Sequence, residues 1–132
     1  MNPYIEIIRP VNCIMSAIAV LIGGVLVLRN VDLFVLLGMV SVILITGFGN
    51  VINDYVDLDA DKINRPKRPI PSGRIKKNTA FGYGILLFVV GVLLVSFINP
   101  VAFFIAVINT LILLFYSTHL QHKLLIGNAV VA

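Results

Sequence analysis

The sequence predicts an all-α protein that crosses a membrane several times. Of its 132 residues, 59% are hydrophobic and only 12% are charged, whereas a soluble domain carries about a quarter charged residues. Four apolar stretches have the length, or nearly the length, of a membrane-spanning helix, which takes about 17–25 residues. Eleven of the sixteen charged residues fall within one interval, 54–77. We therefore predict a polytopic membrane helix bundle with one highly charged connection.

The expected helices follow the apolar stretches in chain order. The four complete transmembrane helices are predicted over 11–28, 33–52, 79–98 and 101–118. Short polar segments, 29–32 and 99–100, separate the first from the second and the third from the fourth. Another apolar stretch starts near Leu124 and reaches residue 132 after nine residues. It is too short to span, so the prediction is four complete helices and the start of a fifth.

Basic residues are distributed unevenly between these helices. Arg9 precedes the first, seven basic residues lie between the second and the third, and Lys123 follows the fourth. The positive-inside rule therefore predicts a multi-pass protein of the cell membrane, with the amino terminus and the loop 59–78 on the cytoplasmic side. Contact with membrane lipids is expected. No nucleic-acid partner is expected despite the net charge of +4, because the basic loop lacks stacking aromatic residues.

The charged connection opens with carboxylates on one face of the expected helix. If the second helix continues through residue 61, at about 100° per residue, five polar residues share an arc of about 100°. These are Asn50, Asn53, Asp54, Asp57 and Asp61. Asp59 falls on the other side. Carboxylates four residues apart repel each other, so we expect a divalent cation with oxygen ligands on this face.

The acidic residues also allow two other interpretations. An EF-hand would need Gly at the sixth loop position and Glu at the twelfth, but these positions hold Lys62 and Arg68. The second alternative is a solvated helix end whose acidic residues pair with the following Lys and Arg residues. Asn50 lies at or near membrane depth, where an idle polar group is costly, and this favours the cation site.

A stiff basic segment follows the acidic residues. Three prolines between residues 66 and 71 exclude a regular helix. Arg65 and Arg68 are then presented on a rigid loop, and the guanidinium group suits bidentate binding of phosphate oxygens. A proline-rich turn with topogenic charges is the alternative. Carboxylates next to basic groups favour a metal ion bound to a polyanion, with Mg²⁺ and diphosphate as the candidates.

The motif from Asn53 to Asp61, NDYVDLDAD, followed by RPIPSG from Arg68 to Gly73, resembles the UbiA superfamily of intramembrane prenyltransferases. That family carries N-D-x-x-D-x-x-x-D and then R-P-[IL]-x-x-G between its second and third membrane helices. All fixed positions match, in the same place between helices. The start Arg9–Cys13, RPVNC, resembles the archaeal branch of the family that makes membrane ether lipids.

The resemblance implies a single domain, a nine-helix bundle, of which residues 1–132 are the amino-terminal part. It implies Mg²⁺-dependent prenyl transfer from geranylgeranyl diphosphate to the hydroxyl of a lipid-like phosphate acceptor, geranylgeranylglyceryl phosphate. Catalysis would involve Asp54, Asp57 and Asp61. The metal ligands would be Asn53, Asp57 and Asp61, and the substrate-binding residues would be Asn12, Asn53, Arg65, Arg68, Tyr116 and Lys123.

The sequence departs from the family pattern in two respects. Family members have Y-[ST]-x-x-L-K after the fourth helix, whereas here Tyr116–Leu120 is followed by Gln121, and a lysine comes only at position 123. A second aspartate motif, which the family places between its sixth and seventh helices, does not occur in residues 1–132. The acidic residues outside the cluster are Glu6 and Asp32. We therefore expect a fragment or one half of a split assembly, inactive alone, with a complementary carboxy-terminal half as partner.

The same motif and charge pattern allow other functions. A family member with an aromatic acceptor, such as a quinone or haem precursor, would carry the same motif. A different class is a non-catalytic membrane fragment, or a transporter segment with the aspartates on a cation pathway. A transport path would place acids at mid-membrane on several helices, whereas these acids cluster at one helix end.

Overall fold

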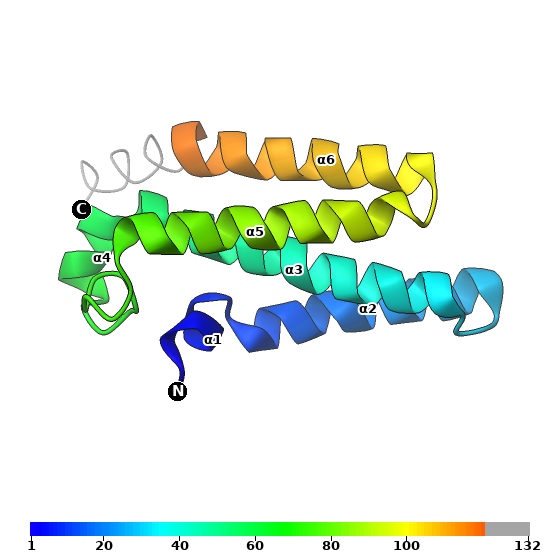
Figure 1. The fold of residues 1–132 in the computed structure, drawn as a ribbon, viewed down its shortest axis with the longest axis horizontal. Coiled ribbons are helices and arrows are strands. Elements are labelled where there is room, and N and C mark those ends of the chain that lie inside the picture. Colours follow the sequence, from blue (N-terminus) through cyan, green and yellow to red (C-terminus); the bar gives the residue numbers. More distant parts are fainter. Residues whose placement is uncertain (121–132) are drawn as a thin grey trace, which may run out of the picture.

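Four long helices form the body of the molecule and confirm the predicted membrane helix bundle (Figure 1). The structure is a computed structural model and describes residues 1–120. The long helices are α2 (Pro10–Leu28), α3 (Leu33–Val56), α5 (Lys77–Ser96) and α6 (Pro100–Phe115). A π-helical turn, Tyr116–Leu120, extends α6. All four are long and apolar enough to cross a membrane. The stretch that starts near Leu124 lies outside the described residues.

Capping side chains explain where two of these helices begin. The Asp32 carboxylate accepts a hydrogen bond from the Val35 amide at 2.9 Å, at the start of α3. The Asn99 side chain accepts one from the Ala102 amide at 2.7 Å, at the start of α6. Each bond satisfies an amide that the first helical turn leaves without an intrahelical partner. Two short polar connections therefore fold back as tight turns between neighbouring helices.

The α3 helix is the centre of the bundle and packs against α2 and α5, while α6 packs mainly on α5. Its apolar window is 44% buried, against 11% for those of α2 and α6. Close packing uses small residues: a Cβ at Gly91 on α5 would lie 2.9 Å from Ile45 on α3. The Ser41 hydroxyl donates to the Gly91 carbonyl at 2.7 Å, so a polar bond also joins these two helices.

The expected continuous helix through residue 61 is wrong. Helix α3 ends at Val56, Asp57 has φ −83° and ψ 10°, and α4 begins at Leu58 and ends at Asn64. Repulsion between carboxylates four residues apart disfavours a straight continuation. The backbone nevertheless keeps the helical hydrogen bonds on both sides, from Asp57 N to Asn53 O at 2.9 Å and from Asp61 N to Asp57 O at 2.8 Å. The helical spacing of the acidic residues therefore survives the bend.

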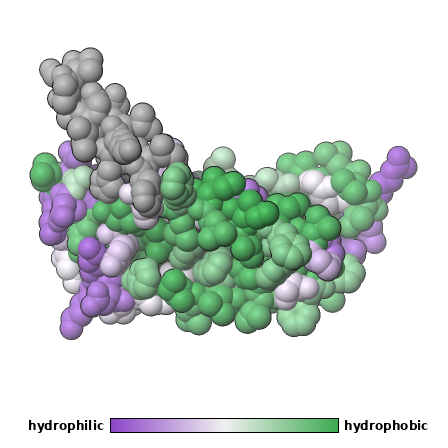
Figure 2. Space-filling view, turned by 90° about the horizontal axis from the view of Figure 1, so that it is seen from above, coloured by the Kyte–Doolittle hydropathy of each residue, from purple (hydrophilic) through white to green (hydrophobic). Residues whose placement is uncertain are grey.

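The polar segments gather at one end of the bundle. The amino terminus, the short helix α1 (Pro3–Ile7) and α4 lie together there, and the α2–α3 and α5–α6 turns lie at the other end (Figure 1). Figure 2 shows a hydrophobic band between two polar ends. No helix forms between residues 65 and 76, which agrees with the prediction for the three prolines between residues 66 and 71.

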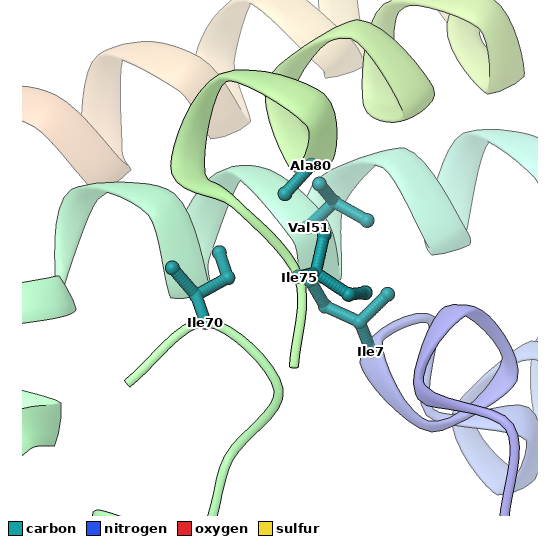
Figure 3. Close-up of a cluster of buried hydrophobic side chains, with 5 residues drawn as sticks. All are labelled: Ile7, Val51, Ile70, Ile75 and Ala80. Carbon is teal, nitrogen blue, oxygen red and sulfur yellow. The ribbon is translucent and has the colours of Figure 1, made fainter. Parts of the chain in front are cut away.

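A buried apolar cluster fixes the loop to the helices (Figure 3). It joins Ile7 of α1, Val51 of α3 and Ala80 of α5 to Ile70 and Ile75 of the loop, and each is at most 6% exposed. The loop therefore has an apolar anchor at two points along its length. Its charged side chains are held next to α3 and α4 by this packing.

Candidate functional site

A hollow at the junction of α3, α4 and the loop brings together most of the predicted site residues. We call it the charged pocket. Its volume is about 380 Å³. It is lined by Arg9, Asn53, Asp57, Ala60, Asp61, Asn64, Arg65 and Arg68. Three arginines and two carboxylates therefore face one space, with two side-chain amides between them.

Asp57 and Asp61 are separated from Asp59 as the helical spacing predicts. Asn53, Asp57 and Asp61 lie on the lining of the charged pocket. The Asp59 side chain is 96% exposed and pairs with Lys62 at 3.1 Å, outside the pocket. The bend at Asp57 does not change this division, because the backbone bonds on both sides of Asp57 preserve the four-residue period.

Asp54 and Asn50 do not lie on the pocket lining, although the predicted arc included them. The Asp54 carboxylate is 3% exposed and accepts from Arg9 Nη2 at 2.5 Å and from Arg68 Nη1 at 3.0 Å. The Asn50 amide donates to the Ile8 carbonyl at 2.7 Å. This part of the arc faces the turn between α1 and α2. Within the structure, Asp54 holds two arginines in place and does not itself face the pocket.

Arg68 lies between two carboxylates. Its Nη1 is 2.5 Å from Asp61 Oδ2 and 3.0 Å from Asp54 Oδ1. The alternative in which acids pair with the following basic residues therefore describes Asp54, Asp59 and Asp61 in this structure. Such pairing neutralises carboxylates that burial would otherwise penalise. The two ion pairs also fix the position of the Arg68 guanidinium on the lining of the charged pocket.

The donor set of the charged pocket suits a hard cation. Among the described residues no three His, Cys, Asp or Glu side chains gather as a metal site. Two carboxylates, Asp57 and Asp61, and the Asn53 amide do line one space. Oxygen donors of these two kinds are what Mg²⁺ takes in proteins, often with substrate phosphates completing the coordination. The residues present therefore fit a metal held jointly by protein and substrate.

Arg9 is a site residue that the sequence analysis did not assign. Its backbone is left-handed, with φ 52° and ψ 77°, a conformation that costs a non-glycine residue about 1–2 kcal/mol. The Ile8 carbonyl next to it accepts from Asn50 and, at 3.2 Å, from the Cys13 thiol. These contacts hold the turn that brings Arg9 to Asp54, 45 residues away in the chain.

Ser117 is the second residue that was missed. It is 1% exposed, and its hydroxyl donates to the Asn53 side-chain oxygen. This bond orients an expected metal ligand from the π-helical turn after α6. The Tyr116-Ser117 part of the family motif is the sequence signal for this position, but the prediction names Tyr116 and not Ser117 as the site residue.

Three predicted substrate-binding residues lie elsewhere or outside the described part. Tyr116 is 49% exposed, and Asn12 is exposed on α2. Neither is on the lining of the charged pocket. Lys123 lies outside the described residues. The structure thus brings Arg65 and Arg68 to the pocket but not Asn12 or Tyr116.

A second, apolar groove of about 480 Å³ lies between α2, α3 and α6. Its α3 wall includes Phe34, Gly38, Ser41 and Ile45. Ile45 precedes Asn53 by eight residues, which is about 12 Å along a helix. The α3 helix therefore carries an apolar groove toward one end and the charged pocket at the other.

Comparison with known proteins gives consistent results. The model of the UbiA prenyltransferase family matches residues 13–132. The chain is 43% identical over 132 residues to the digeranylgeranylglyceryl phosphate synthase of Methanothermobacter thermautotrophicus, covering 100% of this chain and 47% of that protein. It is 42% identical over 131 residues to the protein of that name from Sulfurisphaera tokodaii, covering 98% and 47%.

A solved structure is also similar. It is described as giving structural and mechanistic insights into the biosynthesis of digeranylgeranylglyceryl phosphate synthase in membranes. Its TM-score to this chain is 0.87 at 41% identity, over 90% of this chain and 43% of that one. The chain spans about half the length of the curated relatives it matches.

Proposed function

Because the chain belongs to the UbiA prenyltransferase family, we propose that it supplies the donor-diphosphate site of an archaeal lipid prenyltransferase. The reaction is transfer of a geranylgeranyl group from its diphosphate to the hydroxyl of geranylgeranylglyceryl phosphate. Residues 1–132 would be the amino-terminal part of one domain, with a complementary carboxy-terminal half as partner. One observation carries the proposal: Asn53, Asp57 and Asp61 share a pocket with three arginines at the end of a membrane bundle.

The pocket residues have complementary roles toward the donor. Members of the family generally use a divalent metal ion to bind diphosphate. We propose that this ion is Mg²⁺, held by Asn53, Asp57 and Asp61, where it would polarise the leaving diphosphate. Arg9, Arg65 and Arg68 would bind diphosphate oxygens, since guanidinium forms paired hydrogen bonds with them. These fixed positive charges stabilise the negative charge that develops as the allylic C–O bond breaks.

Asp54 has a positioning role in this proposal. Its carboxylate holds Arg9 and Arg68 together from behind the pocket. Fixing both guanidinium groups before the donor binds reduces the reorganisation that diphosphate binding requires. Asp54 would therefore contribute to the reaction through the arginines and not as a metal ligand.

The apolar groove is the proposed place for the isoprenoid chain. It lies along α3, the helix that also carries Asn53, and its lining is largely hydrophobic. An apolar surround also excludes water, which would otherwise capture the allylic cation. The charged pocket would face the cytoplasm, because the amino terminus and the loop 59–78 carry most of the basic residues.

A transferase assay on the full-length protein tests the proposal. Geranylgeranyl diphosphate is supplied with Mg²⁺, and geranylgeranylglyceryl phosphate is compared with an aromatic quinone precursor as acceptor. We expect product only with the lipid phosphate and only with the divalent ion present. Product with the aromatic acceptor alone would contradict the proposed acceptor. No product with either would contradict the proposed reaction.

A further inference from the structure

A second hollow adjoins the charged pocket on the loop side. We call it the outer pocket, and its volume is about 320 Å³. It is lined by Glu6, Asn64, Arg65, Pro66, Lys67 and Arg68. Three of these residues, Asn64, Arg65 and Arg68, also line the charged pocket. The two hollows therefore share a wall that contains two arginines.

The charge of the outer pocket differs from that of its neighbour. Glu6 is the one acidic residue on the outer lining among the residues the structure describes. Arg74 binds both of its carboxylate oxygens, at 2.6 and 2.9 Å. This bond lowers the pKa of Glu6, so the carboxylate stays ionised and neutralised by Arg74. The remaining charges on the lining are positive: Arg65, Lys67 and Arg68, of which Arg68 also pairs with Asp54 and Asp61 from the side of the charged pocket.

This difference determines which ligand each hollow suits. The charged pocket has Asp57 and Asp61 for a metal ion. In the outer pocket the lone carboxylate is already held in a bidentate pair. An anion there would bind directly to lysine and arginine. A compact phosphate group, with its several acceptor oxygens, suits such a set of donors.

The outer pocket is also held in shape before any ligand binds. Arg74 Nη2 donates to the Lys67 carbonyl at 2.6 Å as well as to Glu6. The side chains of Ile70 and Ile75 anchor the loop in the buried apolar cluster (Figure 3). Pro66 restricts the backbone between Arg65 and Lys67. A preorganised site binds more tightly because less ordering accompanies binding.

We propose that the outer pocket binds a phosphate monoester without a metal ion, and that this group is the headgroup of the lipid acceptor. The inference rests on the proposed function and adds to it a separate location for the acceptor. A phosphate held on one side of the Arg65 and Arg68 wall brings the hydroxyl of the same headgroup toward a diphosphate on the other side. The outer pocket would then select a phosphate-bearing acceptor over an aromatic one.

Binding without donor or metal tests this assignment. The full-length protein in zwitterionic nanodiscs with EDTA is titrated with dihexanoyl phosphatidic acid, a monoester, followed by native mass spectrometry. Dihexanoyl phosphatidylglycerol, a diester, and inorganic phosphate are titrated in parallel. We expect the monoester lipid to bind most tightly. We expect Lys67→Gln to weaken it about tenfold, the loss of one charge-assisted hydrogen bond.

Lys62→Gln is the matched control, because Lys62 lies in the same charged stretch, pairs with Asp59 and lines neither hollow. It should change monoester binding less than twofold. Three results would overturn the assignment: equal binding of monoester and diester, inorganic phosphate binding as tightly as the lipid, or equal losses in the two lysine variants. No prenyl transfer occurs under these conditions, so failure of the proposed reaction appears separately, in the transferase assay.

Discussion

Asp57 and Asp59 are two residues apart in the chain but lie in opposite environments. Asp57 lines the charged pocket, whereas the Asp59 side chain is 96% exposed. We predict that Asp57→Asn lowers Mg²⁺-dependent turnover of the full-length enzyme by about 100-fold or more, because charge stabilisation at the leaving group is lost. Asp59→Asn should leave turnover within about twofold, as a surface pair contributes little. Equal losses in both variants, measured by steady-state kinetics, would leave the metal-site assignment without support.

Asp54 lies behind the pocket, and its substitution should act on stability as well as activity. Removing its carboxylate takes the shared partner from Arg9 and Arg68, and Arg68 keeps only its pair with Asp61. Breaking a buried ion pair costs about 3–5 kcal/mol. Because the Arg9 side chain is 33% exposed, we expect about 3 kcal/mol for Asp54→Asn. The free energy of unfolding in mixed detergent micelles measures it.

A double-mutant cycle with Arg9→Gln separates pairing from packing. The double variant should lose less stability than the sum of the two single variants. Strict additivity would contradict a direct Asp54–Arg9 interaction.

Helical spacing predicted which residues face the charged pocket only where those residues come from one short stretch of the chain. Asn53, Asp57 and Asp61 face one pocket, and Asp59 does not, because the four-residue period survives the bend. Asp54 lies on the same predicted helix face, but its carboxylate binds Arg9, which is 45 residues earlier in the chain. The spacing of residues along one helix does not show where a second helix will pack. Neither the Arg9–Asp54 pair nor the Ser117–Asn53 hydrogen bond could therefore be predicted from the sequence.

At the scale of elements, the α3–α5 contact depends on Gly91. A Cβ there would lie 2.9 Å from Ile45 Cγ1 and 3.2 Å from the Ser41 carbonyl oxygen. We predict that Gly91→Ala destabilises the bundle by about 1–3 kcal/mol through overpacking. Gly82→Ala is the control on the same helix, because nothing lies within 4 Å of its added Cβ. It should be neutral or slightly stabilising, since alanine favours helix. Unfolding of both variants is compared in the same micelles.

The contact of α1 with the loop should depend on pH through Glu6. Arg74 lowers the pKa of Glu6 below its ordinary value of 4.5. A carboxyl whose folded pKa is depressed adds stability above its unfolded pKa and loses it as pH falls through the folded value. The protection factors of the α1 amides, which compare the intrinsic exchange rate at each pH with the observed one, should therefore be high at pH 7 and fall as the pH drops below the ordinary Glu pKa of 4.5. In Glu6→Gln the protection factors should be low at both pH values; a protection factor that still falls with acid in that variant would contradict the assignment to Glu6.

The long helices were predictable and the short ones were not. Apolar runs of the required length fix α2, α3, α5 and α6 within a few residues. Helix α1 has five residues and α4 has seven, which is too short for a periodic signal. Their positions follow from tertiary contacts: Ile7 packs on Val51, and Arg68 binds Asp61. The Ile7–Val51 contact joins distant parts of the chain, and the Arg68–Asp61 pair depends on how the proline-rich loop folds back, so neither leaves a periodic pattern in the sequence.

At the scale of the whole molecule, the order and lengths of the helices followed from hydropathy, because only helices of bilayer length satisfy the backbone in lipid. The packing order did not. α3 is central and 44% buried in its apolar window, whereas α2 and α6 are 11% buried in theirs. The central helix and the two outer helices look equally apolar in the sequence, because lipid and the protein interior favour the same side chains. The difference in burial between α3 and the outer helices becomes visible only when the packing of the neighbouring helices is known.

The low burial of α2 and α6 bears on what residues 1–132 can do alone. The charged pocket offers two carboxylates, Asp57 and Asp61, to a diphosphate that carries charge on two phosphoryl groups. The relatives are about twice as long. We predict that purified residues 1–132 bind Mg²⁺ and diphosphate weakly at best and transfer no prenyl group. Coexpression with the carboxy-terminal half of the Methanothermobacter thermautotrophicus relative should restore transfer, and Asp57→Asn in residues 1–132 should abolish that restoration. Turnover by residues 1–132 without a partner would show that one acidic face is sufficient.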